Sequence, residues 1–228
     1  MDSISGGLYE ARQSGVDTMS QASFSVAISV FTAVNIAIAS LGARISYNWP
    51  IYQRGTSGWL LLGFFIGCLV VSVSGALWAQ SNDSPGISLI GGAICAVAIG
   101  VLVGPFVSRY DAESVLEALI LTTGVVVLTG FIGAVIPKDL SGWGPPLFAG
   151  LIGLIAATFI VPLFGIPHSM LILDVVGIAL FSGLMMYDMN QARYLDRTLN
   201  NAIDVAVNTF LNFANIFIRI LSLMGNDD

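Results

Sequence analysis

Apolar residues run along most of the chain in stretches of about 20, separated by prolines, glycines and charged residues. A helix needs about 20 mostly apolar residues to cross the hydrocarbon core of a bilayer. Six clear stretches of this kind lie at residues 23–43, 58–79, 86–108, 114–136, 146–165 and 169–189. Backbone groups in lipid need hydrogen-bond partners within their own segment, so these stretches are predicted to be helices.

A seventh stretch, residues 204–225, is apolar except for one polar stripe: Asp204, Asn208, Asn212, Asn215 and Arg219. At about 100° per residue the five positions fall within an arc of about 80°. Amides and a guanidinium facing acyl chains are costly, so we expect the stripe to face protein or water. This predicts an all-α, seven-helix bundle with the last helix at the centre. Alternatively, the asparagines only join helices, with a modest gain in stability.

The sixth stretch contains two acidic residues, Asp174 and Asp188. Fourteen residues apart, they would project within about 40° of each other, about 21 Å apart along a helix. A short connection makes the sixth and seventh helices antiparallel neighbours. Asp188 should then lie near Asn208 and Asn212, and Asp174 near Arg219. An ionisable residue inside a spanning helix is a functional candidate by default, because burial makes its charge costly.

Each acidic residue also has a structural explanation. Asp188, near the end of its stretch, would reach the lipid headgroups, and Asp174, near the start, would be stabilised by the helix dipole. Glu113 and Glu117 open the fourth stretch, where the first turn of a helix favours carboxylates. Alternatively, Glu117 lines a vestibule, and acids at both mouths of a polar helix attract cations and offer oxygen ligands to calcium.

The composition agrees with a membrane protein and excludes several classes. Of the 228 residues, 56% are apolar and only 10% are charged, and the mean hydropathy is +0.87. The net charge of −6 argues against a nucleic-acid site or a polybasic arm that binds lipid. The single histidine, His168, excludes multi-histidine zinc hydrolases, and the single lysine, Lys138, lies in a predicted loop, unlike that of a retinal pigment. Cys68 and Cys95 can form neither a disulfide framework nor a zinc cluster. We therefore expect neither an enzyme nor a bound cofactor.

The organisation expected from the sequence is simple. Residues 1–22 form a polar tail, 23–225 a single membrane domain and 226–228 a short acidic tail. The first segment matches neither a signal peptide nor a transit peptide. Four lysines and arginines lie on the side of the membrane that carries the amino terminus, and three lie on the other side. Because the cytoplasmic side carries more of these residues, the difference of one favours an amino terminus inside the cell. We expect a multi-pass protein of a prokaryotic inner membrane.

Five sequence motifs in the second half of the chain follow one another in a familiar order. They are GPFVSRY (104–110), VLEA (115–118), PKDLSGWG (137–144), YDMNQ (187–191) and NTFLNFANIFIRILSLMG (208–225). With these motifs the chain resembles a prokaryotic-type member of the Bax inhibitor-1 family, the transmembrane Bax-inhibitor-motif proteins. The resemblance implies a bundle of seven helices, with six of them around a central last one. It also implies a pH-sensitive calcium leak channel, suppression of cell death and, in bacteria, association with a membrane protease.

The chain departs from this family at two points. The resemblance implies a proton-sensing pair of aspartates, of which the first falls on Asp188 but the second on Asn212. An amide cannot share a proton with a carboxylate, so we expect weaker pH dependence, or one set by desolvation of Asp188 alone. The second helix, residues 58–80, carries no charge and so lacks the acid and latching arginine that some relatives have there. Arg219 would replace this latch by pairing with Asp174 if its side chain spans about one turn.

The sequence thus leaves two functions open. The first is a passive conduit for calcium or other cations, lined by the polar stripe. In it Asp188 acts as gate and as a transient calcium ligand, while Glu113 and Glu117 concentrate ions. The second is a non-conducting regulator that binds a membrane protease or a cell-death or stress partner through its helix faces.

Overall fold

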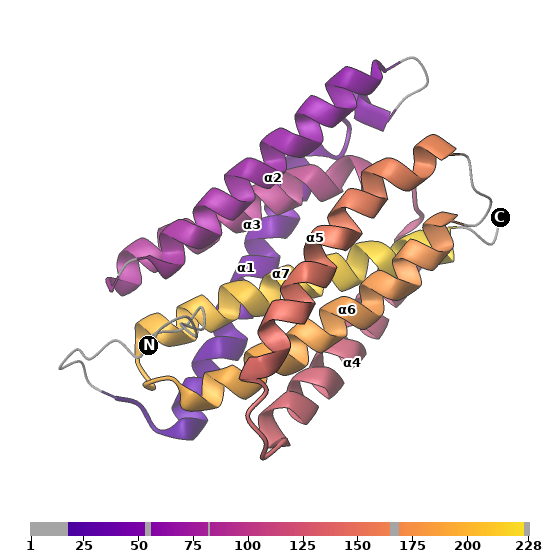
Figure 1. The fold of residues 1–228 in the computed structure, drawn as a ribbon. Coiled ribbons are helices and arrows are strands. Elements are labelled where there is room, and N and C mark those ends of the chain that lie inside the picture. Colours follow the sequence, from indigo (N-terminus) through magenta and orange to yellow (C-terminus); the bar gives the residue numbers. More distant parts are fainter. Residues whose placement is uncertain (1–17, 53–55, 82, 165–168, 226–228) are drawn as a thin grey trace, which may run out of the picture. The chain divides into compact units, whose positions relative to one another are not determined.

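The computed structural model describes residues 18–52, 56–81, 83–164 and 169–225. Throughout these ranges the regular structure is helical, as expected (Figure 1). The seven long helices are α1 (Gln21–Ser46), α2 (Gly58–Gln80), α3 (Pro85–Val107), α4 (Ala112–Val135), α5 (Gly144–Ile160), α6 (Ser169–Gln191) and α7 (Leu199–Met224). Short 3-10 turns follow α1, precede and follow α5, and follow α6: Pro50–Tyr52, Ser141–Trp143, Val161–Phe164 and Ala192–Tyr194.

The helix boundaries differ from the predicted ones where local caps decide them. The first helix begins at Gln21, inside the predicted tail, because the Ser20 hydroxyl accepts a hydrogen bond from the Ser23 backbone N–H at 3.1 Å. The last helix begins at Leu199, five residues early, because the Thr198 hydroxyl accepts one from Asn201 N–H at 3.2 Å. The rest of the predicted tails, residues 1–17 and 226–228, lies outside the described residues.

All seven helices in the described part of the chain are long and apolar enough to cross a membrane. Large apolar side chains are exposed along them, for example Trp59 at 83%, Leu41 at 67% and Val127 at 65%. Exposed apolar surface of this extent suits contact with acyl chains. The most apolar window of α7 is 61% buried, more than that of any other helix. A position of α7 surrounded by all six other helices stays a prediction.

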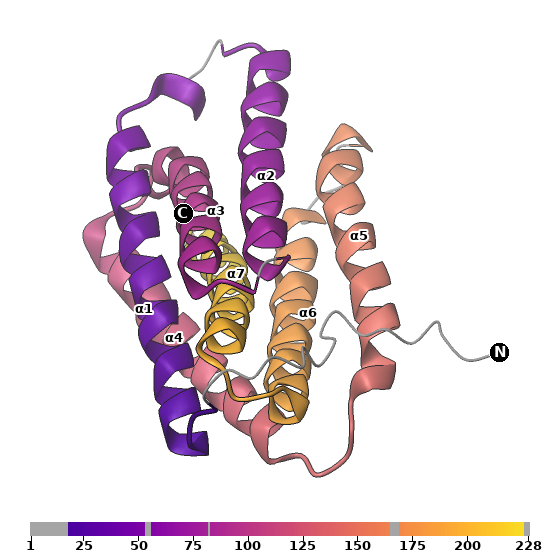
Figure 2. The same ribbon diagram turned by 90° about the vertical axis from the view of Figure 1, so that its left-hand side faces the viewer.

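The chain forms two compact units that divide α7 between them. One unit contains α1, α2, α3 and α7 up to Phe210. Within it α3 lies between α1 and α2 (Figure 2). Glycines on α3 make both approaches possible: a methyl group at Gly100 would collide with the Ala39 carbonyl of α1, and one at Gly91 would stand 2.6 Å from the Ala79 nitrogen of α2. Close backbone approach through small residues is typical of helices packed in membranes.

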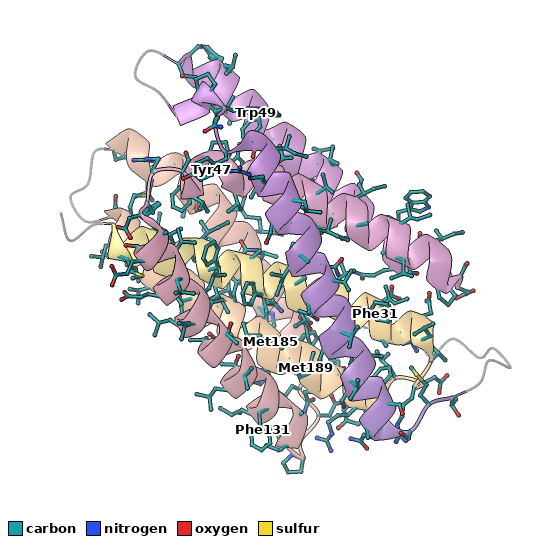
Figure 3. All side chains as sticks on the ribbon, turned by 180° about the vertical axis from the view of Figure 1, so that it is seen from behind. Phe31, Tyr47, Trp49, Phe131, Met185 and Met189 are labelled. Atoms are coloured by element: carbon teal, nitrogen blue, oxygen red, sulfur yellow. The ribbon has the colours of Figure 1, made fainter. Side chains whose placement is uncertain are left out.

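The other unit contains α4, α5, α6 and α7 from Leu211. Here α6 packs against α5 and against α4. A methyl group at Gly130 of α4 would stand 2.8 Å from the Met185 Cε atom of α6, and Met189 lies beside it (Figure 3). The next residue of α4, Phe131, is 64% exposed and lies on its outer face. This packing positions one face of α6 for α4 and leaves another for α7.

Candidate functional site

The buried carboxylate of α6 and the amide of α7 are in direct contact. The Asn212 Nδ2 atom donates a hydrogen bond of 2.7 Å to Asp188 Oδ2. Asp188 is 8% exposed and Asn212 5%. The predicted proximity of these two residues is therefore confirmed. The two side chains form the centre of the candidate site.

Asp188 has little compensation for its charge. Among the described residues, Asn212 is its one hydrogen-bond partner and no basic side chain lies within 4.0 Å of it. A carboxylate has about four positions at which it accepts a proton, a donor or a cation. Asn212 occupies one of these positions, on Oδ2, so the second oxygen, Oδ1, is available to bind a cation. A buried anion with one neutral partner attracts a cation more strongly than a solvated anion does, because water screens the solvated one.

The second acidic residue of α6 forms the ion pair expected from the register. Arg219 Nη1 lies 3.3 Å from Asp174 Oδ1 and donates a hydrogen bond of 3.0 Å to the Leu173 carbonyl. Both side chains are mostly buried, at 14% and 12% exposure. Of the two acidic residues of α6, Asp174 is therefore paired with a cation, whereas Asp188 is paired with the neutral amide of Asn212.

Two residues of α6 explain how Arg219 reaches Asp174. Gly177 lies directly under the guanidinium, where a methyl group would collide with Arg219 Nε. One turn further on, the Phe181 ring lies 5.8 Å from the Arg219 Cζ atom, within range of a cation–π interaction. Asp174, Gly177 and Phe181 share one face of α6 at helical spacing. The arginine side chain lies along this face. It thereby extends over about one helical turn, which is the distance that the register of α6 and α7 requires for contact with Asp174.

The first part of α7 contacts side chains of α2 and α3. Gln80 Nε2 of α2 donates a hydrogen bond of 3.0 Å to Asn208 Oδ1. Asn200 Nδ2 donates one of 3.4 Å to Asp204 Oδ2, and the Ser88 hydroxyl of α3 lies 2.8 Å from Asn200 Oδ1. Sequence reasoning missed Gln80, Ser88 and Asn200. Each stands near a helix end, where polar residues are ordinary, so no local signal distinguishes them.

The remaining candidates have plainer surroundings. Asn215 Nδ2 donates a hydrogen bond of 2.8 Å to the Leu211 carbonyl of its own helix, so its amide does not join two helices through that bond. Glu113 is exposed in the first turn of α4. Glu117 is exposed on the face of α4 that also carries Ile120 and Leu121. The structure therefore turns Glu117 outward, toward the lipid-facing side of its helix.

The motif at the end of α6 holds the loop between α4 and α5. Asn190 is fully buried, and its Nδ2 donates hydrogen bonds of 3.1 Å to the carbonyls of Ile136 and Lys138. Its Oδ1 accepts one of 2.9 Å from the Leu140 backbone N–H. The backbone of this loop is not helical, so its carbonyl and N–H groups lack the hydrogen-bond partners that a helix provides. The Asn190 amide supplies these partners. Two motifs that the sequence shows 50 residues apart form one packed unit next to Asp188.

A carboxylate at the surface completes this clamp. Gln191 Nε2 donates a hydrogen bond of 3.1 Å to Asp139 Oδ1, which also accepts one of 2.8 Å from the Ser141 backbone N–H. These donors favour the charged form, so the Gln191 amide, followed by Ser141, lowers the pKa of Asp139 below its ordinary value. Arg193 donates to the Ile136 carbonyl at the same loop.

Together, seven spanning helices and a buried carboxylate held by the last helix define a multi-pass membrane protein with an ionisable site inside its spanning segments. Residues 22–228 match the family described as Bax1-I, inhibitor of apoptosis-promoting Bax1, and the chain belongs to this family. The resemblance read from its motifs is confirmed.

Relatives in bacteria include proteins described as membrane proteins. The chain is 26% identical over 166 residues to an uncharacterised membrane protein of Streptococcus pyogenes serotype M3, covering 70% of this chain and 71% of the relative. It is 23% identical over 175 residues to the inner membrane protein YbhL of Escherichia coli K12, covering 73% and 74%. A protein of Caulobacter vibrioides is 31% identical over 137 residues, covering 57% and 55%. The protein is thus a multi-pass protein of the bacterial inner membrane, as expected from its sequence.

Proposed function

We propose that this protein is a passive cation conduit, with calcium as the favoured ion, in which Asp188 is both the gate and the transient ion ligand. One observation carries the proposal: a buried carboxylate inside a spanning helix has a single amide partner and no counter-cation among the described residues. Calcium is a hard cation that prefers carboxylate and amide oxygens. Asp188 Oδ1 and the Asn212 carbonyl oxygen are ligands of that kind.

The ligand set suits passage of an ion better than its storage. No group of three or more His, Cys, Asp or Glu side chains able to hold a metal occurs in the described part of the chain. A resident calcium site takes six to eight oxygen ligands, and one carboxylate with an amide falls short of that number. Conduction requires binding that is weak enough for the ion to leave. Asp188 and Asn212 meet this condition.

Asn212 makes the proposed gate less sensitive to pH than two aspartates would be. Two carboxylates at 2.7 Å cannot both ionise, so they share a proton and separate when it leaves. The Asn212 amide does not titrate and donates to Asp188 whenever the carboxylate is charged. The contact between α6 and α7 therefore persists across the range in which an aspartate pair would open.

The Arg219–Asp174 ion pair marks a second point of control in this proposal. It lies on the same face of α6 as Asp188, fourteen residues or about 21 Å away along the helix axis. A fixed positive charge beside a cation path raises the energy of an entering cation. Ions would pass this point only while Arg219 stays bound to Asp174 and to the Leu173 carbonyl, away from the path.

Calcium flux into liposomes that contain the purified protein and a trapped calcium dye tests the proposal. Asp188→Ala should reduce the flux at least tenfold. Asp196→Asn, a neutralised carboxylate outside the helices, serves as the matched control and should leave it within twofold. Equal flux in Asp188→Ala and the unaltered protein at both pH 6 and pH 8 would remove Asp188 from the mechanism. No flux above empty liposomes, with a stoichiometric partner recovered by pull-down, would favour the non-conducting regulator instead.

A further inference from the structure

A groove of about 270 Å³ opens on the unit that contains α1 and α3. Its walls are apolar: Phe31 and Ile38 of α1, Leu89 and Ile90 of α3, and Ile203 of α7. Figure 3 shows Phe31 partway along α1. Ile90 is 54% exposed and Leu89 40%, so the mouth of the groove lies at the outer surface of the helices. In a membrane this mouth meets acyl chains rather than water.

One polar side chain lines this apolar groove. Asn35 of α1 is 6% exposed, and no described residue hydrogen-bonds to its amide. It is the fifteenth residue of the 26-residue helix, about 21 Å from its start and so near the middle of the bilayer. An unpartnered amide at this depth is costly, because neither lipid nor water supplies a partner there.

Neighbouring polar residues show that the missing partner is particular to Asn35. One turn earlier on the same face of α1, the Thr32 hydroxyl donates a hydrogen bond of 2.8 Å to the Ile28 carbonyl. Asn215 satisfies its amide in the same way within α7. Asn35 makes no such bond and extends toward α3. There it faces Gly92: a methyl group at this glycine would stand 3.6 Å from Asn35 Oδ1, 3.9 Å from its Nδ2 and 2.9 Å from the Val207 Cγ2 atom of α7.

We propose that the groove binds an uncharged, long-chain alcohol of the membrane, with its hydroxyl on Asn35 and its chain along the apolar walls. A hydroxyl both donates and accepts, so it satisfies the amide oxygen and the amide nitrogen that face Gly92. A charged headgroup does not reach the depth of Asn35 without leaving the interface.

Competition for a photoreactive label tests this proposal. The full-length protein in detergent is labelled with a diazirine derivative of 1-hexadecanol, and the labelled peptides of α1 and α3 are measured by mass spectrometry. Unlabelled 1-hexadecanol should compete at least fivefold better than hexadecane, which has the same chain without the hydroxyl. Equal competition by both compounds would overturn the proposal.

Two variants locate the preference. Asn35→Leu should abolish the advantage of the alcohol over the alkane, and it should raise Tm because it removes an unpartnered amide. Thr32→Val, on the same helix, should keep the fivefold advantage. An advantage that persists in Asn35→Leu would overturn the proposal. A second pair of results would also overturn it: no labelling of the unaltered protein, together with a dimer, measured by light scattering, that dissociates in Asn35→Leu. The occupant of the groove would then be a second copy of the chain.

Discussion

The two ends of α7 carry the same kind of polar stripe but meet different chemistry. From Asn200 to Asn208 the contacts with other helices include the neutral side chains of Gln80 and Ser88, and the carboxylate at this end, Asp204, belongs to α7 itself and accepts a hydrogen bond from Asn200. From Asn212 to Arg219 the contacts with α6 include two of its carboxylates, at 2.7 and 3.3 Å. Neutral contacts of the first kind join helices with modest strength. Contacts to buried charges are strong when complete and costly when broken, and so they suit a switch.

The largest effect is expected from breaking the ion pair. Arg219→Leu leaves the mostly buried Asp174 carboxylate without its cation, which should cost about 3 kcal/mol in unfolding free energy. The Tm in detergent measures it. The double variant Arg219→Leu with Asp174→Leu should recover most of the loss, since no buried charge remains. A single variant as stable as the unaltered protein would contradict the contrast between the two ends of α7.

A smaller loss is expected at the clamp beside Asp188. Asn190→Ala leaves the Ile136 and Lys138 carbonyls and the Leu140 N–H without their partner, which should cost about 2 kcal/mol. Ser88→Ala, at the other end of α7, removes a hydroxyl that contacts the Ala79 carbonyl and Asn200 Oδ1, and it should cost about 1 kcal/mol. Denaturant unfolding in mixed micelles compares the two. A larger loss in Ser88→Ala than in Asn190→Ala would reverse the expected order of the two regions.

Restoring the second carboxylate should sharpen the contrast further. Asn212→Asp places two carboxylates in contact, so they share one proton at low pH and repel each other once both ionise. Flux in the liposome assay should therefore rise with pH in this variant. Its ratio between pH 8 and pH 6 should be about threefold larger than in the unaltered protein. Asn208→Asp, in the other region of α7, is the control. A pH profile unchanged by Asn212→Asp would contradict the proposed gate.

The smallest effect concerns Asp139 in the surface loop. Its pKa is lowered in the folded protein, so its hydrogen bonds stabilise the loop at neutral pH. This contribution is lost as the pH falls through the folded-state pKa. Amide hydrogen exchange of residues 137–143 should increase in acid. Gln191→Ala should move that increase to higher pH, because the amide is the main cause of the lowered pKa. Identical exchange profiles would show that the Gln191 contact does not matter.

The helices and the main polar contacts were predictable, because each depends on a periodic pattern. The six apolar stretches matched α1 to α6 within a few residues at most boundaries, and the spacing from Asp204 to Arg219 defined one face of α7. Asp174 and Asp188 are fourteen residues apart on α6. With antiparallel α6 and α7, this separation was enough to predict that Asp188 lies near Asn212 and Asp174 near Arg219. The passage of Arg219 over Gly177 was not predictable, because it depends on how closely α7 approaches α6.

The sequence by itself determined that seven apolar helices span a membrane and that one of them buries a polar face, since hydropathy and helical period are local properties of a chain. Only the tertiary structure decided which polar groups meet. Asn190 holding a loop 50 residues away, Gln80 reaching Asn208 and Asn35 being left without a partner all depend on contacts between segments distant in the chain. The physical reason is that a hydrogen bond needs two groups within about 3 Å, and packing alone sets that distance.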